Sequence, residues 1–333
     1  MNQRTISVLA LAAVGLSAVL LSGCPNTTPT AARLHMVWKG VDDDDGIYHA
    51  YFTSNPSSEG WTSQDRIEGV GTSNSPAITA FSYADVPTNP GSPPIGVFIT
   101  WKGIPGDQGL YWAREFNAQT NIPDVGTSSG PAMAAQPFQY VYLAWKGVQG
   151  DSGIYWSYNN LFHAGGGWAP QEEVPNVGTS DRPALAFHRP LLYMAWKGID
   201  GDSGIYVSTN DGGARWQPQL RVPDVGSSAG PALAFFHQAL HMVWKGIPGD
   251  SGIYHSTSFN NGVSWTPQQR IPDVGTSQSP ALAVFNDRLF LAWKGIEGDS
   301  GLYWSASADG VTWRAQENVP GVGSSNGPSL AEE

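Results

Sequence analysis

Apolar and small residues alternate along short stretches of the chain, with the period of two residues that is typical of β-strands. Leu192–Trp196 and Leu240–Trp244 follow this pattern, as strands packed on both faces would. No window of ten or more residues that lacks Gly and Pro shows the 3.6-residue period of a helix. The stretch from residue 226 to 274 therefore predicts four short strands, A to D, joined by turns: Pro231–Phe235, Leu240–Gly246, Gly252–Ser256 and Trp265–Val274.

This unit is repeated, and the tripeptide Trp-Lys-Gly marks each copy. The six copies begin at Trp38, Trp101, Trp145, Trp196, Trp244 and Trp293, so the spacings are 63, 44, 51, 48 and 49 residues. An Asp lies six positions after each Trp, and a Tyr lies ten positions after it. The tyrosines are Tyr48, Tyr111, Tyr155, Tyr206, Tyr254 and Tyr303.

A repeat of about 48 residues with four strands is the signature of a propeller blade. The repeats begin with a B strand at Arg33–Trp38 and end with a lone A strand at Gly327–Ala331. Six A and six B strands balance only if the last A strand pairs with the first B strand. The sequence therefore predicts an all-β, six-bladed β-propeller with four-stranded blades over residues 33–333, closed by pairing of its N- and C-terminal strands.

The first residues predict export rather than a membrane-spanning helix. Ile6–Leu21 is an apolar run of 16 residues, shorter than the roughly 20 that a spanning helix needs. Leu21-Ser22-Gly23-Cys24 resembles the lipobox of bacterial lipoproteins, which implies lipidation of Cys24 after cleavage of a signal peptide at residues 1–23. Residues 24–32 then form a tether. We expect a protein anchored in the cell envelope by lipid, in the periplasm or at the surface.

Composition narrows the class of partner. The net charge of −11 becomes −12 once residues 1–23, with one Arg and no acid, are removed. An acidic surface argues against nucleic acid as a partner. With 14 Trp, 12 Tyr, 40 Gly and 25 Pro, the chain is typical of short strands and tight turns. Cys24 is the only cysteine, so no disulfide is expected. We expect a monomer.

The motif Lys and Asp are the candidate binding residues, because the propeller topology places them on one rim together with the Gly-Thr-Ser or Gly-Ser-Ser turns between blades. The six lysines are the only lysines in the chain. A structural salt bridge across each B–C turn, with the Asp also accepting backbone N–H groups, would explain the pattern as well, and so would simple copying by duplication. An exposed pair stabilises by only about 0–1 kcal/mol, so stability is a weak reason to place every lysine there. The candidate ligand-binding residues are Lys39, Asp44, Lys102, Asp107, Lys146, Asp151, Lys197, Asp202, Lys245, Asp250, Lys294 and Asp299.

The motif aromatic residues are assigned to packing: the Trp to a blade interface, and the Tyr to packing with a hydrogen-bonded hydroxyl. No metal or cofactor is expected, because the seven His lack metal-ligand spacing. A calcium site at Asp42–Asp45, in the first repeat alone, stays open.

The predicted C–D turns Thr209–Trp216 and Ser258–Trp265 resemble the Asp-box of sialidase-type propellers, Ser/Thr-x-Asp/Asn-x-Gly-x-x-Trp, and Ala306–Trp313 is a degraded copy. The resemblance implies a six-bladed fold and a turn pinned by side chains. Sialidase activity would need three arginines, a Tyr–Glu pair and an acidic Asp, and no matching set of arginines is present. We therefore predict no catalytic residues.

These observations favour a lipid-anchored, multivalent binding protein whose ligand is a glycan. The architecture is similar to that of six-bladed fucose-type lectins, in which pockets lie between blades. A sialidase-like glycoside hydrolase predicts instead one asymmetric pocket at the axis. A protein-interaction scaffold predicts an exposed apolar patch.

Overall fold

The computed structural model describes residues 32–333, except 55–58, 83–94, 138, 161–166 and 213–214. Ala32–Glu333 forms one compact unit. The predicted signal peptide, Cys24 and nearly all of the predicted tether lie outside the described residues, so lipidation and the boundaries at residues 23 and 32 stay predictions. In the part described, no helix is long and apolar enough to cross a membrane.

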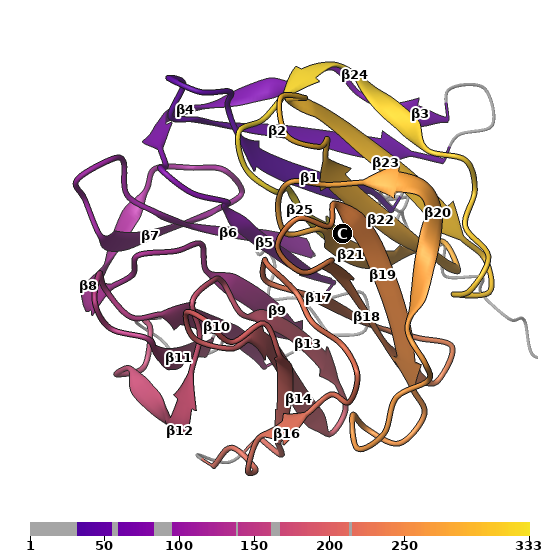
Figure 1. Cartoon of the computed structure of the whole chain (residues 1–333). Helices are drawn as coiled ribbons and strands as arrows, with labels where there is room; N and C mark the ends of the chain where they lie inside the picture. The colour runs from indigo at the N-terminus through magenta and orange to yellow at the C-terminus, as the bar shows by residue number, and fades with distance from the viewer. Residues whose placement is uncertain (1–31, 55–58, 83–94, 138, 161–166, 213–214) are drawn as a thin grey trace, which may run out of the picture. The chain divides into compact units, whose positions relative to one another are not determined.

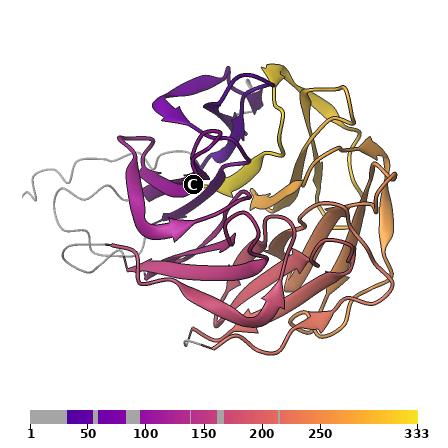
Figure 2. The same cartoon turned by 60° about the vertical axis from the view of Figure 1, so that its left-hand side comes forward.

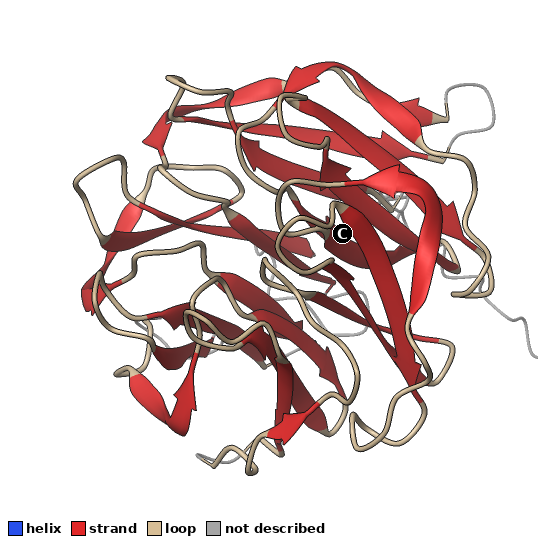
Figure 3. Cartoon of the chain, in the orientation of Figure 1, coloured by secondary structure: helices blue, strands red, loops and turns tan. Residues whose placement is uncertain are grey.

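All regular elements of the described residues are β-strands (Figure 3). They form six antiparallel sheets, which are the blades, and each blade has four strands from the inside outward. Blade 1 also contains the two-residue strand β3 (Gly60–Trp61). The blades are, in order: blade 1, β25 (Ser329–Glu332), β1 (Leu34–Lys39), β2 (Gly46–Thr53) and β4 (Asp65–Gly71); blade 2, β5 (Ala77–Ser82), β6 (Ile95–Lys102), β7 (Gly109–Arg114) and β8 (Thr120–Gly126); blade 3, β9 (Ala132–Gln136), β10 (Tyr140–Lys146), β11 (Gly153–Asn160) and β12 (Glu172–Gly178); blade 4, β13 (Ala184–His188), β14 (Leu191–Lys197), β15 (Ile205–Asn210) and β16 (Leu220–Arg221); blade 5, β17 (Ala232–Phe236), β18 (Ala239–Lys245), β19 (Gly252–Ser258) and β20 (Gln269–Gly275); blade 6, β21 (Ala281–Phe285), β22 (Arg288–Lys294), β23 (Gly301–Ser307) and β24 (Glu317–Gly323).

The innermost strands surround the axis of the unit (Figure 1). Each contacts the innermost strand of the next blade, in the order β5, β9, β13, β17, β21, β25 and back to β5. This circle of contacts confirms the predicted six-bladed propeller.

The ring closes by the pairing predicted from the ends of the repeat. β25 lies antiparallel to β1, with Leu34 opposite Glu332 and His35 opposite Ala331. Arg33 and Glu333 add two backbone hydrogen bonds, of 3.2 and 2.8 Å, beyond the paired strands. Figure 2 shows this yellow C-terminal strand among the indigo strands of the N-terminal blade. The closed ring leaves no inner strand without a neighbour to pair with.

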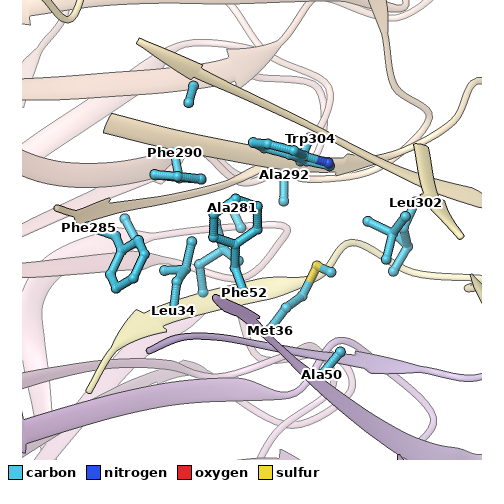
Figure 4. Packing of buried hydrophobic residues seen from close by; sticks show 14 of the residues in the cluster. Leu34, Met36, Ala50, Phe52, Ala281, Phe285, Phe290, Ala292, Leu302 and Trp304 are labelled. Carbon is cyan, nitrogen blue, oxygen red and sulfur yellow. The ribbon is translucent and has the colours of Figure 1, made fainter. Parts of the chain in front are cut away.

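A hydrophobic cluster fills each interface between neighbouring blades. At the closure, Phe52 and Met36 of blade 1 face Phe290 and Trp304 of blade 6 (Figure 4). The six motif tryptophans have no exposed surface, which confirms their assignment to packing. Each stacks on the motif Tyr of its own blade, with ring centroids 6.2–6.4 Å apart.

Strand D continues past a proline in most blades. Five repeats carry this proline, which predicts the end of a strand, at Pro123, Pro175, Pro223, Pro272 and Pro320, but β8, β12, β20 and β24 extend beyond it. In β20, Asp273 follows Pro272 with φ of 56°, and the pairing with β19 shifts register at this point. The proline therefore lies in a β-bulge, where its missing N–H removes no bond from the ladder. In blade 4, β16 does end before Pro223.

Candidate functional site: the motif rim and the clefts between blades

Each motif Lys forms hydrogen bonds with the segment that links the preceding blade to its own blade. In blade 5, Lys245 Nζ donates to Ser228 Oγ at 2.6 Å and to the backbone oxygen of Asp250 at 3.1 Å. Ser228 Oγ in turn donates to the backbone oxygen of Gly246 at 2.7 Å. Since Ser228 lies between blades 4 and 5, this chain of hydrogen bonds joins the two blades.

The same contacts occur in all six blades. The distance from Lys Nζ to Ser Oγ is 2.6–3.1 Å, and that from Lys Nζ to the backbone oxygen of the motif Asp is 2.7–3.2 Å. At the ring closure, Ser325 reaches Lys39 in this way. The structure thus brings the Lys, the Asp and the turn hydroxyls together on one rim, which we call the motif rim.

The motif Asp is held by its own turn and by the motif Tyr. In blade 5, Asp250 Oδ1 accepts from the Gly252 N–H at 2.8 Å, and Oδ2 accepts from the Tyr254 hydroxyl at 2.7 Å. These two donors hold the pKa of the Asp250 carboxyl below its usual value, and the bond to Asp250 raises the pKa of Tyr254. The other five blades repeat both bonds. The predicted hydrogen bond of the Tyr hydroxyl is confirmed.

The salt-bridge interpretation of the motif is only half right. The Asp does accept a backbone N–H, as that interpretation required, but its carboxylate makes no ion pair with the motif Lys within the described residues. Lys39 alone pairs with a carboxylate, that of Asp45, at 3.7 Å. Burial lowers the pKa of Lys102, Lys146 and Lys245. The lysines therefore have structural contacts, and ligand binding by the Lys/Asp pairs stays a prediction.

A cleft of about 420 Å³ opens between blades 4 and 5 on the motif rim. Of the predicted pair in blade 5, Asp250 lies in the wall of this cleft and Lys245 does not. The motif Tyr254, which the sequence assigned to packing, also lines it. The cleft is lined by Ser203, Arg221, Asp224, Val225 and Gly226 from blade 4, and by Gly246, Ile247, Asp250, Tyr254 and Gln268 from blade 5. Charged, amide and hydroxyl groups thus surround one aliphatic surface.

The aliphatic side chain is also repeated. Ile247, directly after Trp-Lys-Gly, is 50% exposed, and the corresponding residues of the other blades are 41–50% exposed. They are Val41, Ile104, Val148, Ile199 and Ile296. In each blade this side chain lies close to a Gly that comes before the turn from the preceding blade, such as Gly226 next to Ile247. A half-exposed aliphatic residue therefore marks each interface on the motif rim.

Sequence reasoning missed most of the residues that line the cleft, among them the repeated Ile247 and Gln268. Gln268 has a position that the repeat keeps constant. It lies one residue before β20 and seven before Gly275, and every repeat has an exposed Gln at this place. The C–D connections differ in length, so the spacing from the motif Trp hides the pattern. The pattern becomes visible when the residues are counted backward from Gly275 and from the corresponding Gly of each other repeat.

The residue opposite the motif Tyr on strand D varies between blades. It is Arg66, Asn121, Glu173, Arg221, Arg270 or Asn318, and each side chain is exposed. In the three blades that carry Arg, the guanidinium helps to lower the pKa of the motif Asp, after the backbone N–H of the turn. The local charge of the rim therefore changes from blade to blade.

The axis contains a cavity of about 80 Å³, lined mainly by Pro, Ala and Leu side chains of the inner strands. Among the described residues that line it, Arg182 alone is ionisable. Its guanidinium donates to the backbone oxygens of Pro280 and Pro328, both at 3.2 Å. This cavity does not hold the three arginines and paired carboxylates that a sialidase-like site requires.

The turn between β19 and β20 has the hydrogen bonds expected from its sequence. Ser258 Oγ accepts from the Gly262 N–H, and Asn260 Oδ1 accepts from the Ser264 N–H, both at 2.9 Å. The Trp265 indole N–H donates to the backbone oxygen of Gly262. These bonds explain why the turn is compact; membership of the Asp-box family stays a prediction.

Within the described residues, no group of three or more His, Cys, Asp or Glu side chains is arranged to hold a metal ion. The acidic run Asp42–Asp45 accordingly forms no such group.

Comparison with known proteins defines the fold. No family model matches the chain, and no curated protein matches it. Aleuria aurantia lectin, as a mutant in complex with Fucα1-6GlcNAc, is similar in structure with a TM-score of 0.60 and 13% identity over 89% of this chain and 97% of that chain. AofleA from Arthrobotrys oligospora has a TM-score of 0.60 and 12% identity over 90% and 85% of the two chains. The chain is thus an all-β protein of the six-bladed β-propeller class. A further structure of Aleuria aurantia lectin, described by that fold and by a novel fucose recognition mode, has a TM-score of 0.55 and 11% identity over 89% and 97%.

Proposed function

We propose that this protein is an exported, lipid-anchored binding protein that holds glycans in the clefts between its blades. The cleft between blades 4 and 5 carries the proposal. Asp250, Tyr254 and Gln268 offer hydrogen-bond acceptors and donors there, and Ile247 offers an apolar surface. Neutral sugars present hydroxyl groups beside C–H surfaces, so such a mixture suits them.

The repeat extends this chemistry around the ring. Each interface has the motif Asp and Tyr, a half-exposed aliphatic residue and an exposed Gln. Weak sites on one rigid ring gain avidity for a surface that carries many copies of the ligand. Lectins with this fold have been solved, one of them in complex with Fucα1-6GlcNAc, which supports a glycan as the ligand class.

Anchoring rests on the resemblance of Leu21–Cys24 to a lipobox. A lipid on Cys24 would hold the propeller at a membrane surface of the cell envelope, and the tether would give it some freedom to turn. The protein acts as a monomer, because one ring already presents several sites.

A protein-binding surface is the second candidate function. The six aliphatic side chains on the motif rim, each 41–50% exposed, would favour contact with an apolar partner. The central cavity gives no comparable support to a glycosidase.

The full chain, purified from bacterial membranes in detergent, is applied to an array of immobilised neutral and sialylated oligosaccharides, fucosylated ones included. We expect retention on a subset of neutral glycans and competition by the free sugar. Replacement of Cys24 by Ser should release the chain from the membrane fraction without changing glycan retention. Retention on no glycan would overturn the binding function; membrane association that survives Cys24→Ser would overturn the anchor.

A further inference from the structure

An exposed glutamine directly precedes strand D of every blade. These side chains are exposed, and none lies within the strand pairing. They are Gln64, Gln119, Gln171, Gln219, Gln268 and Gln316.

The positions beside this Gln have changed freely between repeats. The next residue is Asp65, Thr120, Glu172, Leu220, Gln269 or Glu317, and it too is exposed in every blade. Recent duplication would have preserved both positions equally. An exposed side chain gains little from packing, so burial does not explain why the Gln alone is constant.

The geometry directs this Gln into the cleft. Gln268 lines the space between blades 4 and 5 together with Asp250 and Tyr254. In the corresponding interface of blades 2 and 3, Gln171 Nε2 donates across to the backbone oxygen of Asp124 at 3.4 Å. The Gln side chain is therefore long enough to reach from its own blade to the preceding blade.

We propose that the repeated Gln is a ligand-contacting residue, and that the ligand shared by the clefts is a neutral, polyhydroxylated sugar. This inference rests on the proposed glycan-binding function. A primary amide offers one acceptor oxygen and two N–H donors, which together can engage neighbouring hydroxyl groups of one sugar ring.

The charge of the rim points to the same ligand class. Two residues after the Gln, the side chain is Arg in three blades, Asn in two and Glu in one. A ligand with a fixed charge would be attracted to some of these clefts and repelled by others. The constant Gln, Tyr and aliphatic side chains carry no charge, and both oxygens of the constant Asp carboxylate already accept hydrogen bonds from the turn and from the Tyr hydroxyl. The repeated part of the site therefore favours a neutral ligand.

The test uses the full chain with all six glutamines replaced by Ala. Its matched control carries Ala at the six positions that directly follow these glutamines, which are also exposed and lie on the opposite face of the strand. Both proteins are measured on the neutral oligosaccharide that retains the wild-type chain best, and on its sialylated form. Circular dichroism and thermal unfolding report whether each ring stays folded.

Loss of one hydrogen bond per site should weaken each site about fivefold, and the loss multiplies over several sites. We expect the Gln variant to lose at least tenfold in avidity at an unchanged unfolding temperature, and the control to stay within about twofold of wild type. Equal retention by the Gln variant and wild type would overturn the role of the Gln while leaving glycan binding intact. Preference of wild type for the sialylated glycan would overturn the neutral ligand class. Failure of wild type to bind any glycan would remove the proposed function and this inference with it.

Discussion

Blades 3 and 5 have the same strand order and the same motif contacts, yet they differ on both of their faces. Toward the preceding blade, blade 5 forms one wall of the open cleft, whereas blade 3 is tied to blade 2. Gln108 Oε1 accepts from the Gln149 N–H at 2.6 Å across that interface. The corresponding residues at the open cleft are Ser203, which is too short, and Pro248, which has no N–H to donate.

Toward the following blade, the two blades bury different pairs of side chains. Blade 3 places Tyr142 and Trp156 there, and burial raises the pKa of Tyr142 to about 12. Blade 5 places His241 and His255 at the same positions, with their ring nitrogens 3.1 Å apart. The comparison teaches that the repeat keeps the strand order and the motif contacts constant. Other positions, both at the surface and in the core, differ between blades, so the interfaces differ in their hydrogen bonds and in their buried ionisable groups.

The largest expected difference is in sensitivity to acid. Burial lowers the pKa of His241 and His255 to about 4, while an unfolded His titrates near 6.5. The unfolded chain therefore binds protons first as the pH falls, so the free energy of unfolding decreases from pH 6.5 toward pH 4. Each pKa unit corresponds to about 1.4 kcal/mol, so His255 alone accounts for up to about 3 kcal/mol.

Urea denaturation at several pH values measures this slope. His255→Trp, which copies blade 3, should flatten it. Blade 1 has the corresponding pair His35 and His49, so part of the slope should survive. An unchanged slope in His255→Trp would show that the blade 5 pair does not carry the acid response.

The motif lysines should act alike in the two blades, because their contacts are alike. Lys245→Met removes the donor to Ser228 and to the backbone oxygen of Asp250, and Lys146→Met removes the matching bonds to Ser128 and Asp151. We expect each substitution to lower the free energy of unfolding by about 1–3 kcal/mol.

Denaturation of Lys245→Met, Lys146→Met and the exposed control Arg270→Met measures the effect, and the control should change by less than about 0.5 kcal/mol. Unchanged stability with weakened glycan retention would instead identify the lysines as the ligand contacts that the sequence predicts.

The propeller could be predicted because its signals are redundant. Six Trp-Lys-Gly tripeptides at spacings of 44 to 63 residues, and an unpaired strand at each end of the repeats, both indicate one closed ring. The contacts of the candidate binding residues are harder to predict from the sequence. Lys245 and Asp250 are close in sequence, but only the conformation of the turn decides that the ammonium meets the backbone oxygen and not the carboxylate.

Two other features required the folded chain. The register shift in β20 depends on the left-handed conformation of Asp273 after Pro272, so the proline alone wrongly predicted the end of the strand. Gln268 was hidden because the C–D connection before it varies in length, although the spacing of seven residues to Gly275 is constant in the repeats. The hydrogen bond between Gln108 Oε1 and the Gln149 N–H likewise joins residues of different blades, so the sequence of one repeat does not reveal it.

The smallest expected effect comes from exchanging the two kinds of cleft. Gln108→Ser removes the bond to the Gln149 N–H and should open the interface of blades 2 and 3, while Ser203→Gln with Pro248→Gln should bridge the interface of blades 4 and 5. One exposed hydrogen bond changes the free energy of unfolding by no more than about 1 kcal/mol, so both proteins should stay folded. The useful readout is the number of sugar molecules bound per chain, measured by titration calorimetry. It should rise by one in Gln108→Ser and fall by one in the double variant. If the number stays constant in both, sugar does not occupy the clefts between the blades, whatever the array shows.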